Sequence, residues 1–77
     1  MDSIVPEISV VVPVFNEAPN LKELYTRIVA ALEALDRDFE VLMVDDGSSD
    51  GSYEILLSLQ SADPRLRIIR LARNFGQ

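Results

Sequence analysis

Three aspartates and two glycines are concentrated in one short polar segment, residues 45–51, directly after the largely apolar run 39–44. Carboxylates can accept hydrogen bonds from a ligand, and glycines allow backbone turns that other residues avoid. In open α/β sheets, ligands bind at the carboxyl ends of the strands, where such segments occur. Asp, Gly and Ser are also the commonest turn residues, so an ordinary turn before a helix remains an alternative.

A second polar segment, Phe15-Asn16-Glu17, follows another apolar run, residues 8–14. If the two runs are adjacent parallel strands, the two polar segments face each other across one crevice, about a strand spacing apart. That crevice would offer an aromatic ring, carboxylates and exposed backbone amides, but no lysine. Such a site suits the base and ribose of a nucleotide better than its phosphates.

Spacing argues against several other sites. A dinucleotide-binding loop needs three glycines after the first strand, and residues 15–19 contain none, which also excludes a P-loop. A calcium loop of the EF-hand type beginning at Asp46 would place Leu57 where its bidentate glutamate belongs. The chain has no cysteine or histidine, which excludes disulfides, thiolate nucleophiles and imidazole ligands.

Hydrophobic periodicity predicts the elements that position these segments. We expect strands over residues 8–14, 39–45 and 66–71, and helices over residues 20–35 and 50–61. Strands joined through helices form a parallel sheet. The expected fold class is therefore α/β: a three-layer, parallel β-α-β-α-β, Rossmann-like nucleotide-binding half-domain with strand order 3-2-1.

Local signals mark the ends of the two helices. Asn20 and Glu23 have the spacing of a capping box, and Asp50 or Gly51 begins the second helix, with Asp50 as a candidate cap. Pro64 marks where the second helix has ended. One apolar stripe is expected to face the core from the first helix: Leu21, Leu24, Tyr25, Ile28, Val29, Leu32 and Leu35.

The strands differ in composition. Residues 8–14 are almost continuously β-branched, which predicts burial on both faces, with Pro13 near the strand end. Residues 66–71 are more polar and favour a sheet edge. The strand order leaves the first strand with an open edge, so we expect the chain to be the front piece of a longer protein. Copies of this piece are expected to associate through that edge.

Composition limits the class of protein. The chain has 77 residues, 48% of them hydrophobic, and a net charge of −6, as expected of one small globular domain rather than a nucleic-acid-binding module. No apolar run is long enough to span a bilayer, and the N-terminus lacks signal-peptide features, so a soluble piece is expected. Residues 63–77 carry four arginines and one aspartate. These arginines either form a solvated face or help to hold an anionic ligand or membrane phosphate.

Three segments together resemble the start of a family 2 glycosyltransferase: residues 11–17, residues 44–52 and Leu71-Ala72-Arg73-Asn74-Phe75-Gly76. They are most similar to the branch of dolichol- and undecaprenyl-phosphate mannosyl- or glucosyltransferases. The resemblance implies a GT-A fold, a UDP- or GDP-linked sugar donor and a polyprenyl phosphate acceptor. It also implies an enzyme at the cytoplasmic face of a membrane, attached through a C-terminal part, with a role in cell envelope glycan synthesis.

The resemblance also implies roles for individual residues. Asp46 would hydrogen-bond the base, Glu17 would contact the nucleoside, and Asp45 would brace the strand end. Asp50 and Gly51 would shape the turn and cap the second helix, and Arg73 is a weaker donor-site candidate. The full set implied to bind nucleotide is Pro13, Phe15, Glu17, Asp46, Gly47, Asn74 and Gly76.

The family's metal-binding Asp-x-Asp, which would hold Mg²⁺ or Mn²⁺ against the donor diphosphate, is expected downstream of Gln77, and so is the catalytic base. We therefore expect no catalytic or metal-binding residue within these 77 residues, and a piece that is inactive by itself. The alternative is a non-catalytic α/β nucleotide-binding or assembly module. An Asp-x-Asp after a further apolar strand would favour the enzyme.

Overall fold

The computed structural model describes residues 5–71, which form a three-stranded parallel sheet with two helices. In chain order the elements are β1 (Ile8–Val14), α1 (Leu21–Glu33), β2 (Phe39–Asp45), α2 (Ser52–Ala62) and β3 (Leu66–Arg70). The sheet order is β1-β2-β3, with Val14 opposite Asp45 and Asp45 opposite Arg70. This is the predicted parallel 3-2-1 order, and it brings the carboxyl ends of all three strands to one edge of the sheet.

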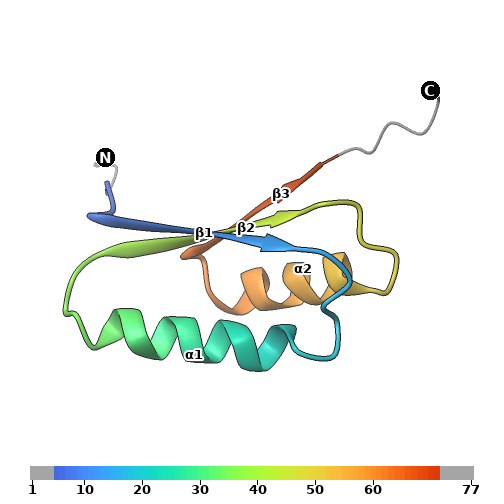
Figure 1. Cartoon of the computed structure of the whole chain (residues 1–77). Coiled ribbons are helices and arrows are strands. Elements are labelled where there is room, and N and C mark those ends of the chain that lie inside the picture. Colours follow the sequence, from blue (N-terminus) through green and yellow to red (C-terminus); the bar gives the residue numbers. More distant parts are fainter. Residues whose placement is uncertain (1–4, 72–77) are drawn as a thin grey trace.

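Both helices lie on the same face of the sheet (Figure 1). The described residues therefore build two of the three layers expected for the fold. The core between these layers is made of buried apolar residues from all five elements: Val14, Leu21, Tyr25, Leu32, Phe39, Val41, Met43, Leu56 and Leu66.

The opposite face of the sheet carries apolar side chains that no described element covers. Val11 is 61% exposed and Ile69 is 43% exposed. The prediction that β1 is buried on both faces is thus wrong for the described residues, because both helices pack on one side. The prediction that β3 lies at a sheet edge is confirmed, since β3 pairs with β2 alone among the described strands.

Pro13 lies within β1, one residue before its end. The Ile8 N–H donates to the Asp38 carbonyl, and the Asp46 N–H donates to the Val14 carbonyl. The backbone N–H and C=O groups of residues 8 and 14 therefore point toward β2. By the alternation of a strand, position 13 faces the open edge, where proline removes a donor that β2 does not use.

Helix α1 ends at Glu33, two residues earlier than the predicted limit, and Leu35 is 55% exposed rather than part of the core stripe. The Leu35 and Asp36 N–H groups donate to the Leu32 and Glu33 carbonyls, which tightens the last turn. Asp36 then takes a left-handed φ of 56°. Leu35 thus lies beyond the last residue of α1, and the buried stripe ends at Leu32.

The capping predictions are also corrected. Asn20 precedes α1 but makes no side-chain capping hydrogen bond, because its backbone already has helical rather than extended angles (φ −112°, ψ −7°). Helix α2 begins at Ser52, with Gly51 in the capping position at φ 92°. Asp50 therefore lies one residue before the cap.

Candidate functional site

The segments after β1 and β2 lie against each other at the carboxyl edge of the sheet, as the sequence predicts. The Asp46 N–H donates to the Val14 carbonyl over 2.9 Å, which extends the β1–β2 pairing by one residue. Phe15 is 48% exposed, and Glu17 and Asp46 are also exposed. Pro13 and Gly47 lie at the same edge, so the structure brings together five of the seven predicted nucleotide-binding residues. The other two, Asn74 and Gly76, lie outside the described residues, as does Arg73.

Asp45 ends β2 and is completely buried. Its Oδ1 accepts a hydrogen bond from the Ser48 N–H over 3.1 Å, which starts the turn after the strand. Its Oδ2 makes no hydrogen bond and lies 4.0 Å from the Arg70 Nε, while the Arg70 guanidinium lies 4.0 Å from the centre of the Tyr53 ring. Asp45 thus ties the ends of β2 and β3 together from inside the protein.

Asp50 uses both carboxylate oxygens within the chain. Oδ1 accepts from the Ser52 hydroxyl over 2.6 Å and from the Ser52 N–H over 3.0 Å, and Oδ2 accepts from the Ala18 N–H over 3.0 Å. The hydrogen bond from the Ser52 hydroxyl holds the pKa of Asp50 below its ordinary value. Asp50 therefore joins the turn after β2 to the loop after β1.

The crevice was expected to offer exposed backbone amides, but the N–H groups of residues 16–18 are bonded within the chain. The Asn16 N–H donates to the Ser48 Oγ over 2.8 Å, and the Glu17 N–H donates to the Ser52 Oγ over 3.0 Å. With the Ala18 N–H, three successive amides are bonded to side chains of the other segment. Spacing could not reveal this, because serines in a Gly-rich turn look like ordinary turn residues.

The arginines of residues 63–71 do not form one cluster but make separate ion pairs. Arg65 pairs with Asp63 over 2.9 Å and with Glu33 over 3.2 Å, and Arg67 lies 3.7 Å from Glu40. A cavity of about 430 Å³ at the amino-terminal edge of the sheet is lined partly by these two arginines and by Arg37. Arg37 lies 3.5 Å from Glu7, so each of the three arginines has an acidic partner and this cavity is not built to hold an anion.

Two further properties limit what the described residues can do. Among residues 5–71, no group of three or more acidic side chains is placed to hold a metal ion. None of the helices in the same range is long and apolar enough to cross a membrane. At the carboxyl edge of the sheet, the exposed described residues offer carboxylate oxygens and an aromatic ring.

The fold and this edge define an α/β protein of the open-sheet class, with its candidate ligand site at the carboxyl ends of β1 and β2. The profile of glycosyl transferase family 2 matches residues 9–77. The chain belongs to this family.

Individual relatives agree with the family assignment. Undecaprenyl-phosphate 4-deoxy-4-formamido-L-arabinose transferases of Salmonella dublin and Salmonella enteritidis are each 46% identical to the chain over 74 residues. The match covers 95% of this chain and 23% of those relatives, so the chain spans about a quarter of their length.

Among solved structures, a mannosyltransferase from Pyrobaculum calidifontis in complex with GDP-mannose and Mn²⁺ is similar, with a TM-score of 0.69 and 26% identity. The match covers 97% of this chain and 22% of that one. The fold is thus that of the first part of a GT-A glycosyltransferase.

Proposed function

We propose that the chain forms the nucleotide-recognition part of a glycosyltransferase that transfers a hexose from a UDP- or GDP-linked donor to a polyprenyl phosphate or related acceptor. The observation that carries the proposal is the edge where Phe15, Glu17 and Asp46 lie together at the carboxyl ends of β1 and β2. Family membership and the named acceptor of the relatives support it.

The residues have distinct proposed tasks. The exposed ring of Phe15 offers a surface on which a base can stack, and the Asp46 carboxylate can accept hydrogen bonds from base N–H groups. Glu17 can accept hydrogen bonds from ribose hydroxyls. We propose that Pro13 and Gly47 line the base pocket through their backbone, and that Asn74 and Gly76 lie near the donor.

The remaining parts of the reaction are proposed to lie outside residues 1–77. A divalent cation would supply charge neutralisation at the donor diphosphate, and the Mn²⁺ complex of the Pyrobaculum mannosyltransferase supports this. By the family pattern, we propose that its Asp-x-Asp lies downstream of Gln77. The chain alone is then inactive in sugar transfer, and attachment to the cytoplasmic face of a membrane belongs to a C-terminal part.

Titration of the chain with UDP and GDP, followed through backbone amide chemical shifts, tests the nucleotide site. We expect the largest shifts at Phe15, Glu17 and Asp46 for at least one nucleotide. Inorganic pyrophosphate is the control and should leave these amides unchanged, because the proposed site recognises the nucleoside. Shifts confined to other surfaces, or equal shifts with pyrophosphate, would contradict the proposal.

A further inference from the structure

The side chains of Ser48, Asp50 and Ser52 hold a loop that is more than thirty residues away in sequence. Each accepts a hydrogen bond from one of three successive amides: Ser48 from Asn16, Ser52 from Glu17 and Asp50 from Ala18, over 2.8, 3.0 and 3.0 Å. One hydrogen bond runs in the opposite direction: the Ser49 N–H donates to the Asn16 Oδ1 of the β1–α1 loop over 2.9 Å. Four bonds thus join the two segments.

The acceptors are themselves held in place. The completely buried Asp45 accepts a hydrogen bond from the Ser48 backbone N–H. Asp50 accepts the hydroxyl proton of Ser52, which is also completely buried, so the lone pairs of that hydroxyl face the Glu17 N–H. Acceptors that are fixed in this way define one geometry for the loop rather than several.

The loop needs this support because its backbone is not in a regular element. Asn16 has a φ of 51°, a left-handed conformation that costs a residue with a side chain about 1 kcal/mol. No helix or strand pairs with the N–H groups of residues 16–18. The three side chains supply those partners, and so fix the backbone that carries Phe15 and Glu17.

We propose that Ser48, Asp50 and Ser52 are positioning residues of the nucleotide site, a latch that sets Phe15 and Glu17 at a fixed place relative to Asp46. The inference rests on the proposed nucleotide-binding function. It separates the polar segment into two parts: Asp46 faces the ligand, and the other three side chains face the neighbouring loop.

Amide hydrogen exchange measured by NMR tests the latch without any nucleotide. Ser48→Ala should speed exchange at Asn16, and Ser52→Ala should speed it at Glu17, each by roughly fivefold to tenfold, as expected for the loss of one hydrogen bond. Exchange in the middle of β2 should not change. Ser49→Ala is the matched control, because Ser49 contributes its backbone N–H and keeps it.

The same variants then test positioning. Ser48→Ala should weaken binding of UDP or GDP by roughly fivefold to tenfold. Ser49→Ala should bind as the natural chain does, and Ser48→Thr, which keeps the hydroxyl, should restore most of the affinity. If Ser52→Ala does not fold because its site is buried, Ser48→Ala and Ser48→Thr carry the test.

Each failure has a separate meaning. Unchanged exchange at Asn16 in Ser48→Ala would overturn the latch. Faster exchange with unchanged nucleotide affinity would overturn its positioning role. If the natural chain binds neither UDP nor GDP, the proposed function fails and the positioning role fails with it. The exchange data would then still report whether the two segments are joined.

Discussion

Three carboxylates within six residues have three different environments. Asp45 is completely buried, Asp50 is exposed but uses both oxygens within the chain, and Asp46 is exposed at the end of β2. A carboxylate committed to backbone and hydroxyl donors cannot at the same time accept hydrogen bonds from a ligand through the same lone pairs. We propose Asp46 as the ligand contact because it is exposed and directly follows β2, at the carboxyl edge of the sheet.

Glycine is required at position 51 because of its backbone conformation, and not because a side chain there would collide with its neighbours. Its φ is 92°, and a Cβ built on it would meet no atom within 4 Å. Gly51→Ala should therefore lower the free energy of unfolding by about 1 kcal/mol through backbone strain alone. Urea denaturation measures the loss. Ser49→Ala, at an exposed turn residue without a positive φ, is the comparison and should cost little. A fully stable Gly51→Ala protein would show that the turn can take another conformation.

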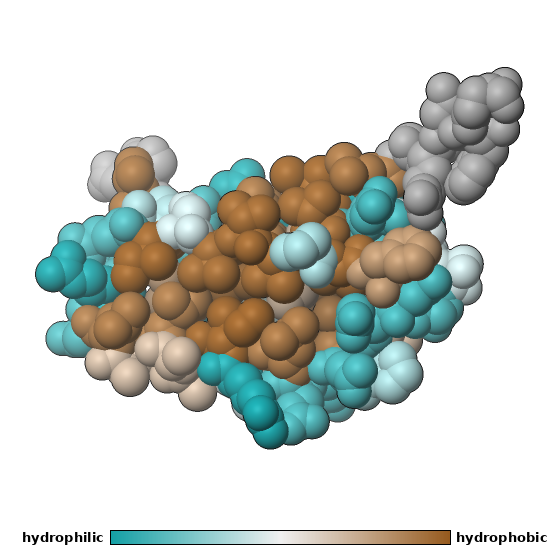
Figure 2. Space-filling model, viewed as in Figure 1, coloured by the Kyte–Doolittle hydropathy of each residue, from teal (hydrophilic) through white to brown (hydrophobic). Residues whose placement is uncertain are grey.

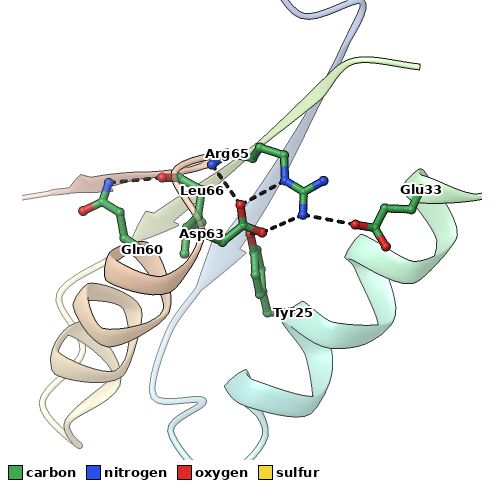
Figure 3. Close-up of polar contacts among 6 residues, drawn as sticks. All are labelled: Tyr25, Glu33, Gln60, Asp63, Arg65 and Leu66. Atoms are coloured by element: carbon green, nitrogen blue, oxygen red, sulfur yellow. Dashed lines mark hydrogen bonds and ion pairs between the residues drawn. The ribbon is translucent and has the colours of Figure 1, made fainter. Parts of the chain in front are cut away.

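At the scale of elements, one polar network joins α1 to the turn before β3 (Figure 3). The Tyr25 hydroxyl donates to the Asp63 Oδ2 over 2.7 Å, and Arg65 bonds both oxygens of Asp63 and reaches Glu33. The Arg65 guanidinium also lies 4.5 Å from the centre of the Phe39 ring, at the start of β2. This network lies at the amino-terminal edge of the sheet, opposite the candidate site.

This network predicts a pH dependence of stability. The hydrogen bonds from Arg65, followed by that from Tyr25, lower the pKa of Asp63 to about 2 from an ordinary value of 3.8. Because the pKa is lower in the folded chain, the stabilisation is complete above about pH 4 and is lost as the pH falls toward 2. Burial, with the nearby Asp63 carboxylate, raises the pKa of Tyr25, so Tyr25 stays protonated throughout this range.

Asp63→Asn should reduce the free energy of unfolding by about 1.5–3 kcal/mol at pH 7, the range for hydrogen bonds to charged groups. Urea denaturation of both proteins between pH 7 and pH 2 should show this difference shrinking below pH 4. Asp38→Asn, at an exposed carboxylate, is the control and should cost little at any pH. A difference between Asp63→Asn and the natural chain that stays constant to pH 2 would contradict the assignment.

The sequence predicts the order of the elements well because apolar periodicity reports burial directly. The run 39–45 coincides with β2. Five residues of the predicted stripe lie in the core or pack against it, namely Leu21, Tyr25, Ile28, Val29 and Leu32, but Leu24 does not. The end of α1 was less predictable, because apolar spacing continues to Leu35 although the helix ends at Glu33 and Leu35 is exposed. The latch was not predictable, since its partners lie 32–35 residues apart and serine carries no signal for such a contact.

At the scale of the whole molecule, the apolar surface is not confined to the core. Figure 2 shows brown, hydrophobic residues spreading across the side of the molecule on which β1 lies. Among the described strands β1 pairs with β2 alone, and Val11 in its middle is 61% exposed. An open strand edge beside apolar side chains is a template for pairing with another chain.

We therefore expect this 77-residue chain to associate through β1 with a second copy. Val11→Lys places a charge in the middle of the edge strand and should shift the chain toward a monomer in sedimentation velocity at high concentration. Leu57→Lys, which changes a residue of α2 that is 43% exposed, is the matched control and should not change the association. A natural chain that sediments as a monomer at every concentration would argue against this edge contact.

The central claim is that Asp46 recognises the nucleoside while the rest of its segment supports the neighbouring loop. The most direct measurement is the dissociation constant of UDP or GDP for Asp46→Asn, with Asp38→Asn as a control of equal charge change. Loss of one charge-assisted hydrogen bond predicts binding at least tenfold weaker for Asp46→Asn and unchanged binding for Asp38→Asn. Equal affinity of the two variants for the nucleotide would contradict the claim.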